Sequence, residues 1–153
     1  MSRRDQIRMT DDEMETFLAE ARTLQVASIN ADGTPHLVPM WFARHGDDLA
    51  FWTYGKSQKI VNLRRDPRIT VMAEAGTQYE ELKGVSITGR AKLIDDLDEV
   101  LRFGESIYER YWGPITDDAI REGVRMMGSK RVLVVVEPDK VVSWDHAKLG
   151  GGY

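Results

Sequence analysis

The chain has 153 residues, of which 42% are hydrophobic and 30% charged, and this predicts one folded domain spanning residues 1–153. The absence of cysteine excludes disulfides, thiolate metal sites and a cysteine nucleophile. The net charge of −4 gives no support for a nucleic-acid partner, and no apolar run is long enough to span a membrane. A charged N-terminus without an apolar signal region predicts a cytoplasmic protein.

Short strands dominate the predicted elements. Thr10-Asp11-Asp12-Glu13 predicts a capping box that opens a first helix. Strands are predicted over 24–29, 36–42, 49–54, 68–75, 85–94, 131–136 and 141–144, and further helices over 58–65, 97–111 and 116–127. Pro39 predicts a bulge or a sheet edge, and Pro138-Asp139-Lys140 predicts a turn between the last two strands. This order indicates a mainly β fold, an antiparallel barrel or sandwich with flanking helices.

The segment from Thr53 to Lys59 is the strongest candidate for binding a ligand. A strand ends there, small and hydroxyl residues turn the chain, and a helix begins. The first N–H groups of a helix lack internal partners and lie at the positive end of its dipole. Ser57 and Thr53 add hydroxyl groups and Lys59 adds a charge, which suits a phosphate ester. An ordinary helix N-cap with solvated lysines explains the same residues, and local sequence alone favours it.

Two further segments have two interpretations each. The segment Val38–Phe42 places Met40 and Trp41 at a strand irregularity, where they either line a planar ring or belong to the core. The C-terminal segment from Trp144 to Tyr153 either folds over a pocket, reaches a partner subunit or frays.

Arg64, Arg65 and Arg68 form a basic cluster near the end of the predicted helix 58–65. Cations are favourable at a helix C-terminus, and this explains Arg65 and Arg68. Arg64 remains a candidate phosphate ligand.

No catalytic residue and no metal site is predicted. The histidines His36, His45 and His146 are scattered without metal-ligand spacing. No G-x-S-x-G elbow, dinucleotide-binding glycine motif or P-loop occurs, and no acidic pair stands out. An enzyme with this sequence would therefore depend on a bound cofactor for its chemistry.

Several segments, in order and spacing, carry a family resemblance that covers most of residues 10 to 145. They are Asp32-Gly33-Thr34-Pro35-His36, Val38-Pro39-Met40-Trp41-Phe42, the turn from Thr53 to Lys59, Asn62-Leu63-Arg64-Arg65-Asp66-Pro67-Arg68 and Val85-Ser86-Ile87-Thr88-Gly89-Arg90-Ala91. The sequence resembles the pyridoxamine 5'-phosphate oxidase-like split β-barrel superfamily, in particular its flavin/deazaflavin oxidoreductase B branch. The resemblance implies an antiparallel split β-barrel and a homodimer with two cofactor sites at the subunit interface.

The resemblance also implies roles for particular residues. Ser57 and Lys59 fall where the family grips the cofactor phosphate, in the turn that begins at Thr53. The further cofactor-binding residues that it implies are Lys56 and Arg64 at the phosphate, Pro39, Met40 and Trp41 along the ring, and Trp144, His146 and Lys148 from the second subunit.

The sequence departs from true pyridoxamine phosphate oxidases in the segments that bind the FMN phosphate and the substrate. Met40-Trp41-Phe42-Ala43-Arg44 and Lys83-Gly84-Val85-Ser86 replace the basic motifs, which argues against vitamin B6 oxidation. The pattern resembles relatives that use coenzyme F420, a 5-deazaflavin, and implies hydride transfer to an unsaturated small-molecule acceptor. The alternatives are an FMN-dependent oxidoreductase and a non-catalytic flavin- or haem-binding protein.

Overall fold

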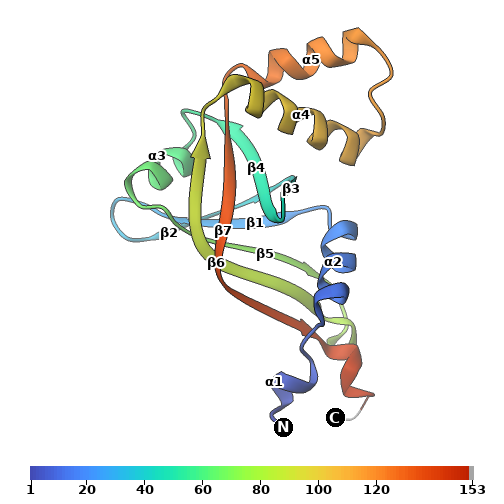
Figure 1. Ribbon diagram of the computed structural model, residues 1–153. Coiled ribbons are helices and arrows are strands. Elements are labelled where there is room, and N and C mark those ends of the chain that lie inside the picture. The colour runs from blue at the N-terminus through green and yellow to red at the C-terminus, as the bar shows by residue number, and fades with distance from the viewer. Residues whose placement is uncertain (152–153) are drawn as a thin grey trace.

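The computed structural model describes residues 1–151. Its strands are β1 (Leu24–Ile29), β2 (Pro35–Met40), β3 (Ala43–His45), β4 (Asp48–Tyr54), β5 (Arg68–Ala75), β6 (Lys83–Ile94) and β7 (Arg131–Asp145). Its helices are α1 (Arg3–Gln6), α2 (Asp11–Glu20), α3 (Gln58–Arg65), α4 (Leu97–Trp112) and α5 (Asp118–Gly128), with short 3-10 turns η1 (Tyr79–Glu81) and η2 (His146–Leu149). Helices α4 and α5 lie at one end of the molecule, and α1 and the end of β7 lie at the other (Figure 1).

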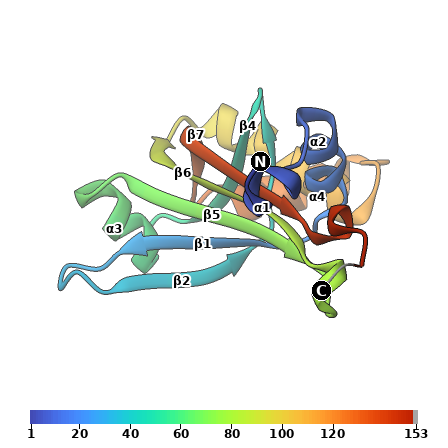
Figure 2. The same ribbon diagram turned by 90° about the horizontal axis from the view of Figure 1, so that it is seen from below.

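The strands form one antiparallel sheet in the order β2-β1-β5-β6-β7-β4-β3. The sheet curls, and its two edge strands, β2 and β3, follow each other in the chain (Figure 2). The fold is therefore a mainly β, antiparallel split barrel with flanking helices, as predicted. Pro39 lies on the edge strand β2 and pairs with Gln25 in regular register, so its missing N–H is tolerated at an edge without a bulge.

Strand β4 and the first part of β7, residues 132–136, are buried on both faces, because a hydrophobic core lies on each side of them. Side chains alternate along a strand, so Leu49 and Phe51 pack into the barrel core. Ala50 and Trp52 pack instead into a second core beneath α4 and α5. The β-branched run in β7 divides in the same way.

The structure corrects two predictions from the sequence. The segments 131–136 and 141–144 are not separate strands, because β7 runs continuously through Pro138. A register shift occurs opposite Gly89, where an added Cβ would lie 2.0 Å from the Glu137 carbonyl oxygen, so only glycine allows this close approach. The short strand β3 was not predicted, because its three residues carry no alternating pattern of their own.

Helices α2, α4 and α5 each begin at a residue whose side chain caps the helix. The Thr10 hydroxyl accepts from the Glu13 backbone N–H, and the Glu13 carboxylate accepts in return from the Thr10 N–H. Asp96 and Asp117 cap α4 and α5 through their carboxylates. Along residues 1–151 no helix combines the length and the apolar character needed to cross a lipid bilayer.

Replacing Gly104 of α4 by alanine is expected to destabilise the protein by roughly 1–2 kcal/mol. The added Cβ would lie 2.3 Å from Cζ3 of the buried Trp52, whose ring also packs against Gly128. The control is Gly123→Ala in α5, where no atom lies within 4 Å of the new Cβ, and it should stabilise by up to about 1 kcal/mol. Urea unfolding measures both, and equal effects of the two substitutions would contradict this packing.

Candidate cofactor-binding site

The turn between β4 and α3 leaves the N-terminus of α3 without a side-chain cap. The Ser57 N–H donates to the Tyr54 carbonyl oxygen at 3.0 Å and closes the turn. Ser57 occupies the N-cap position, yet its side chain makes no capping hydrogen bond. Its hydroxyl has one long contact instead, to the buried Thr53 hydroxyl at 3.5 Å. The first N–H groups of α3 and the Ser57 hydroxyl are therefore available to an anion.

Asn62 fixes α3 against the barrel. Its side chain is fully buried, and its amide nitrogen donates to Ser28 Oγ at 3.1 Å and to Asn30 Oδ1 at 3.0 Å. Its amide oxygen accepts from the Gln58 side chain at 2.8 Å. The full set of bonds locks the helix onto the end of β1, so the direction of its N-terminus is set by the barrel.

Two cations beside this N-terminus lack a counter-charge. Burial, and then the positive charge of Arg131, lower the pKa of Lys59. The Arg131 guanidinium lies over the rings of Trp52 and Tyr54, 4.8 and 4.6 Å from their centroids, and its buried Nε has no hydrogen-bond partner. Within residues 1–151 neither cation forms an ion pair with a carboxylate. An anion bound here would relieve their repulsion.

Arg131 was missed in the sequence because it lies far from Lys59 along the chain. The register of β4 and β7 pairs Tyr54 with Arg131, and the Gly55 N–H donates to the Lys130 carbonyl oxygen at 3.0 Å. The exposed Lys130 and Lys56 flank the same turn. The proximity of these cations can be predicted only when the pairing of β4 with β7 is known.

The segment predicted to line a ring has mixed surroundings. Met40 packs against the barrel core and Pro39 is exposed. The Trp41 ring stacks on Tyr111 of α4, with centroids 4.1 Å apart and planes 3° apart, while 43% of the residue stays exposed. The Tyr111 hydroxyl accepts from the Phe42 N–H at 3.0 Å and so holds this loop against α4. Trp41 is therefore a fixed aromatic wall with an accessible surface.

The structure does not bring Arg64 to the N-terminus of α3. Arg64 lies in the last turn of the helix and pairs with Asp95 at 3.0 Å. Arg65 donates to the Ile29 carbonyl oxygen and Arg68 pairs with Asp66 at 2.7 Å, so both act at the helix end as the sequence favoured.

The C-terminal segment folds onto its own subunit up to the last described residue. Trp144 lies against Gly84, where an added Cβ would be 2.4 Å from the indole. The His146 ring contacts the Tyr79 carbonyl oxygen through Nδ1 at 2.9 Å, and Lys148 pairs with Glu13 at 2.5 Å. Residues 146–149 form the turn η2, while the interpretation of a frayed end concerns residues 150–153 and stays a prediction, since Gly152 and Tyr153 lie outside the described residues.

Within one subunit this segment is remote from the N-terminus of α3. Arg131 and Trp144 lie near opposite ends of the fifteen-residue strand β7. Figure 1 shows α3 beside the upper part of the sheet and the end of β7 at its lower end. The residues predicted at the cofactor phosphate and those of the C-terminal segment therefore form two separate groups on one subunit.

Comparison with known proteins identifies the family. A family model described as pyridoxamine 5'-phosphate oxidase matches residues 10–145. The chain belongs to this family. The family match spans both groups of predicted cofactor residues, except for His146 and Lys148, which follow its last residue. A search of curated proteins finds no match to the sequence.

Solved structures of the same fold accompany the family match. A conserved hypothetical protein, Rv2991, from Mycobacterium tuberculosis is 40% identical, with a TM-score of 0.93 over 100% of this chain and 95% of that one. An F420 reductase is 24% identical, with a TM-score of 0.66 over 86% of this chain and 98% of its own. The haem storage protein HutZ from Vibrio cholerae is 19% identical, with a TM-score of 0.70 over 90% of this chain and 97% of its own.

Replacing Lys59 by methionine is expected to raise the free energy of unfolding of the ligand-free protein. The gain should be small, up to about 1 kcal/mol at neutral pH, because solvent screens a half-buried cation. A lowered pKa means that folding disfavours the charged lysine, so the difference between variant and wild type should shrink as the pH rises towards 10.5. Urea unfolding at several pH values measures this, with the exposed Lys92→Met as control. A loss of stability in Lys59→Met would show that a partner stabilises the charge.

Proposed function

We propose that this protein is an oxidoreductase that binds coenzyme F420 and transfers hydride to an unsaturated small molecule. The observation that carries the proposal is the pair of unneutralised cations, Lys59 and Arg131, at the uncapped N-terminus of α3. Like charges held together in a folded protein cost free energy, so their retention calls for an anion that offsets the cost.

The chemistry of these groups fits a cofactor phosphate. The N–H groups of α3 and the Ser57 hydroxyl would donate to the phosphate oxygens, and Lys59 would supply a charge-assisted bond. The buried Nε of Arg131 is a donor without an acceptor, and an anionic oxygen would satisfy it. In this proposal Thr53 positions the Ser57 hydroxyl, and Arg64 remains in its pair with Asp95.

The number of cations favours F420 over FMN. One phosphate is matched by Lys59 and Arg131, yet the exposed Lys56 and Lys130 add two further charges beside the same turn. A cofactor with a polyanionic tail beyond its phosphate would use them. The F420 reductase among the similar structures agrees with this choice. FMN is the alternative that the same phosphate site admits, and haem storage, the role for which HutZ is named, is a third outcome.

The protein's contribution to the reaction would be binding, orientation and exclusion of water. When bound, reduced F420 supplies the hydride for the acceptor. Trp41, held by its stacking on Tyr111, would form an apolar wall along the cofactor ring. Because Tyr111 also anchors the backbone of Phe42, the wall is fixed before the cofactor arrives, which lowers the entropic cost of binding.

We further propose that two subunits complete each site. Trp144, near the end of β7, and His146 and Lys148, in the following turn η2, lie too far from α3 of their own subunit to reach it. In a homodimer with two-fold symmetry, the C-terminal segment of one subunit would meet the α3 turn of the other at two equivalent places.

Fluorescence titration of the cofactor-free protein with F420 and with FMN tests the cofactor. We expect F420 to bind more tightly than FMN. Lys59→Met should weaken F420 binding by about 1.5–3 kcal/mol, or roughly 10- to 100-fold, because a charge-assisted bond to phosphate is lost. Lys92→Met, which removes an exposed lysine from β6, should leave the affinity unchanged. Tighter binding of FMN would identify an FMN oxidoreductase, and failure of both cofactors would refute the flavin site.

Mixed dimers test the shared site. Lys59→Met and His146→Ala should each weaken F420 binding in the pure variants. When the two variants are coexpressed, each mixed dimer would contain one site with both native residues and one site with neither. Tight binding should therefore return in part, as a second population in the titration. If both residues served the same subunit's site, no tight population would appear.

A further inference from the structure

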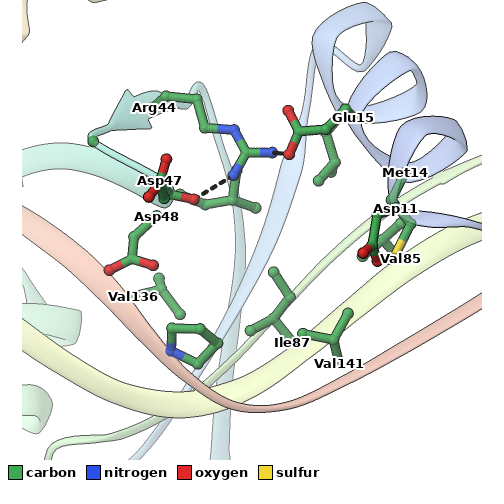
Figure 3. Close-up of a pocket in the computed structure, with 14 residues that line it drawn as sticks. Asp11, Met14, Glu15, Arg44, Asp47, Asp48, Val85, Ile87, Val136 and Val141 are labelled. Atoms are coloured by element: carbon green, nitrogen blue, oxygen red, sulfur yellow. Dashed lines mark hydrogen bonds and ion pairs between the residues drawn. The ribbon is translucent and has the colours of Figure 1, made fainter.

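A second cavity lies away from the proposed cofactor site. It has a volume of about 510 Å³ and opens between α2, the β3–β4 turn, β6 and β7 (Figure 3). Its part of β4 is the beginning, Asp48 and Leu49, whereas Thr53 and Tyr54 lie at the other end of that strand. None of the residues assigned above to the cofactor lines it. The volume falls within the range of roughly 300–1,000 Å³ that is common for small-molecule sites.

The floor of this cavity is apolar. It belongs to the wall of the barrel core and has no polar side chain of its own. Its residues are Leu49, Val85, Ile87 and Val136, with Met14 and Val141 at the margins. Figure 3 shows Ile87, Val136 and Val141 on one side of the cavity and the charged side chains on the other. The apolar part of a ligand bound here would be removed from water, which favours binding by about 25 cal/mol of free energy per Å² of buried apolar surface.

The rim of the cavity carries an excess of negative charge. Arg44 is the single cation of the lining, and its guanidinium is already occupied by Glu15 Oε1 at 2.5 Å and by the Asp47 carbonyl oxygen at 2.6 Å. The carboxylates of Asp11, Asp47 and Asp48 have no hydrogen-bond or ion-pair partner among the residues that the structure describes. Three carboxylates without a counter-charge therefore border an apolar floor.

We propose that this cavity binds a small amphipathic organic cation, with an ammonium group at the carboxylates and an apolar body on the floor. The charge of the rim disfavours anions, and a neutral apolar molecule would leave the carboxylates unmatched. A metal ion does not fit, since the described residues contain no group of three side chains placed to hold one. The cavity shares no lining residue with the proposed cofactor site, so a bound cofactor would not occupy it.

Isothermal titration of the full-length protein with hexyltrimethylammonium tests the proposal, with hexanol and hexyl sulfate as neutral and anionic probes. The cation should bind at least tenfold more tightly than either probe. The double variant Asp47→Asn, Asp48→Asn should weaken it at least fivefold. Val141→Trp, which places bulk over the floor from an exposed position, should weaken it as well. The matched control Asp118→Asn, Glu122→Gln removes two exposed carboxylates from α5 and should change nothing.

Four results would overturn the site. Equal binding of hexyl sulfate, or an unchanged affinity in the Asp47 and Asp48 double variant, would show that the rim does not select the charge. No binding of the cation would show that the cavity is closed, as it would be if a second copy of the chain covered it. Competition by saturating F420 or FMN would place the cation in the cofactor site, whereas an unchanged affinity supports a separate one.

Discussion

Strand β4 and the first part of β7, residues 132–136, must be apolar on both faces, because one face closes the barrel and the other carries α4 and α5. This constraint explains the continuous apolar run in β4 and the β-branched run at the start of β7. It also explains why glycine stands at 104 and 128, where the Trp52 ring leaves no room for a side chain. The pair β4 and β7 thus contacts both the barrel core and the core beneath α4 and α5. Both cores therefore position the residues at the end of β4 and the start of β7.

The proposed cofactor site lies at that end. The β4 strand stops at Tyr54, the turn delivers Ser57, and α3 begins with free N–H groups. Because β7 starts beside Tyr54, Arg131 joins Lys59 without any carboxylate between them. Burial, and then the charge of Arg131, lower the pKa of Lys59, so the charged lysine weakens the fold until an anion binds. This is the usual relation between a binding site and the stability of its scaffold. In the proposed site the stacked Trp41 and Tyr111 would likewise form a fixed surface for the apolar part of the ligand.

The sequence predicted most of the barrel but only half of the site. Local signals, such as the Thr10 capping box and the Ser57 turn, placed α2 and α3 correctly. Pro138 misled the prediction, because its effect depends on Gly89 in a strand far away in sequence. The position of Arg131 beside Lys59 could not be predicted for the same reason, since it depends on the pairing of β4 with β7. Long-range pairing, rather than local propensity, decides these features.

The central claim is that the N-terminus of α3, with Lys59 and Arg131, binds the phosphate of a flavin-type cofactor. A crystal structure of the protein grown with F420 tests it most directly. The account predicts the cofactor phosphate within hydrogen-bond distance of Ser57 Oγ and the Lys59 ammonium, with Trp41 along the ring and the C-terminal segment of a second subunit beside it. A phosphate bound elsewhere, with the Lys59 and Arg131 pair still exposed to solvent, would contradict it.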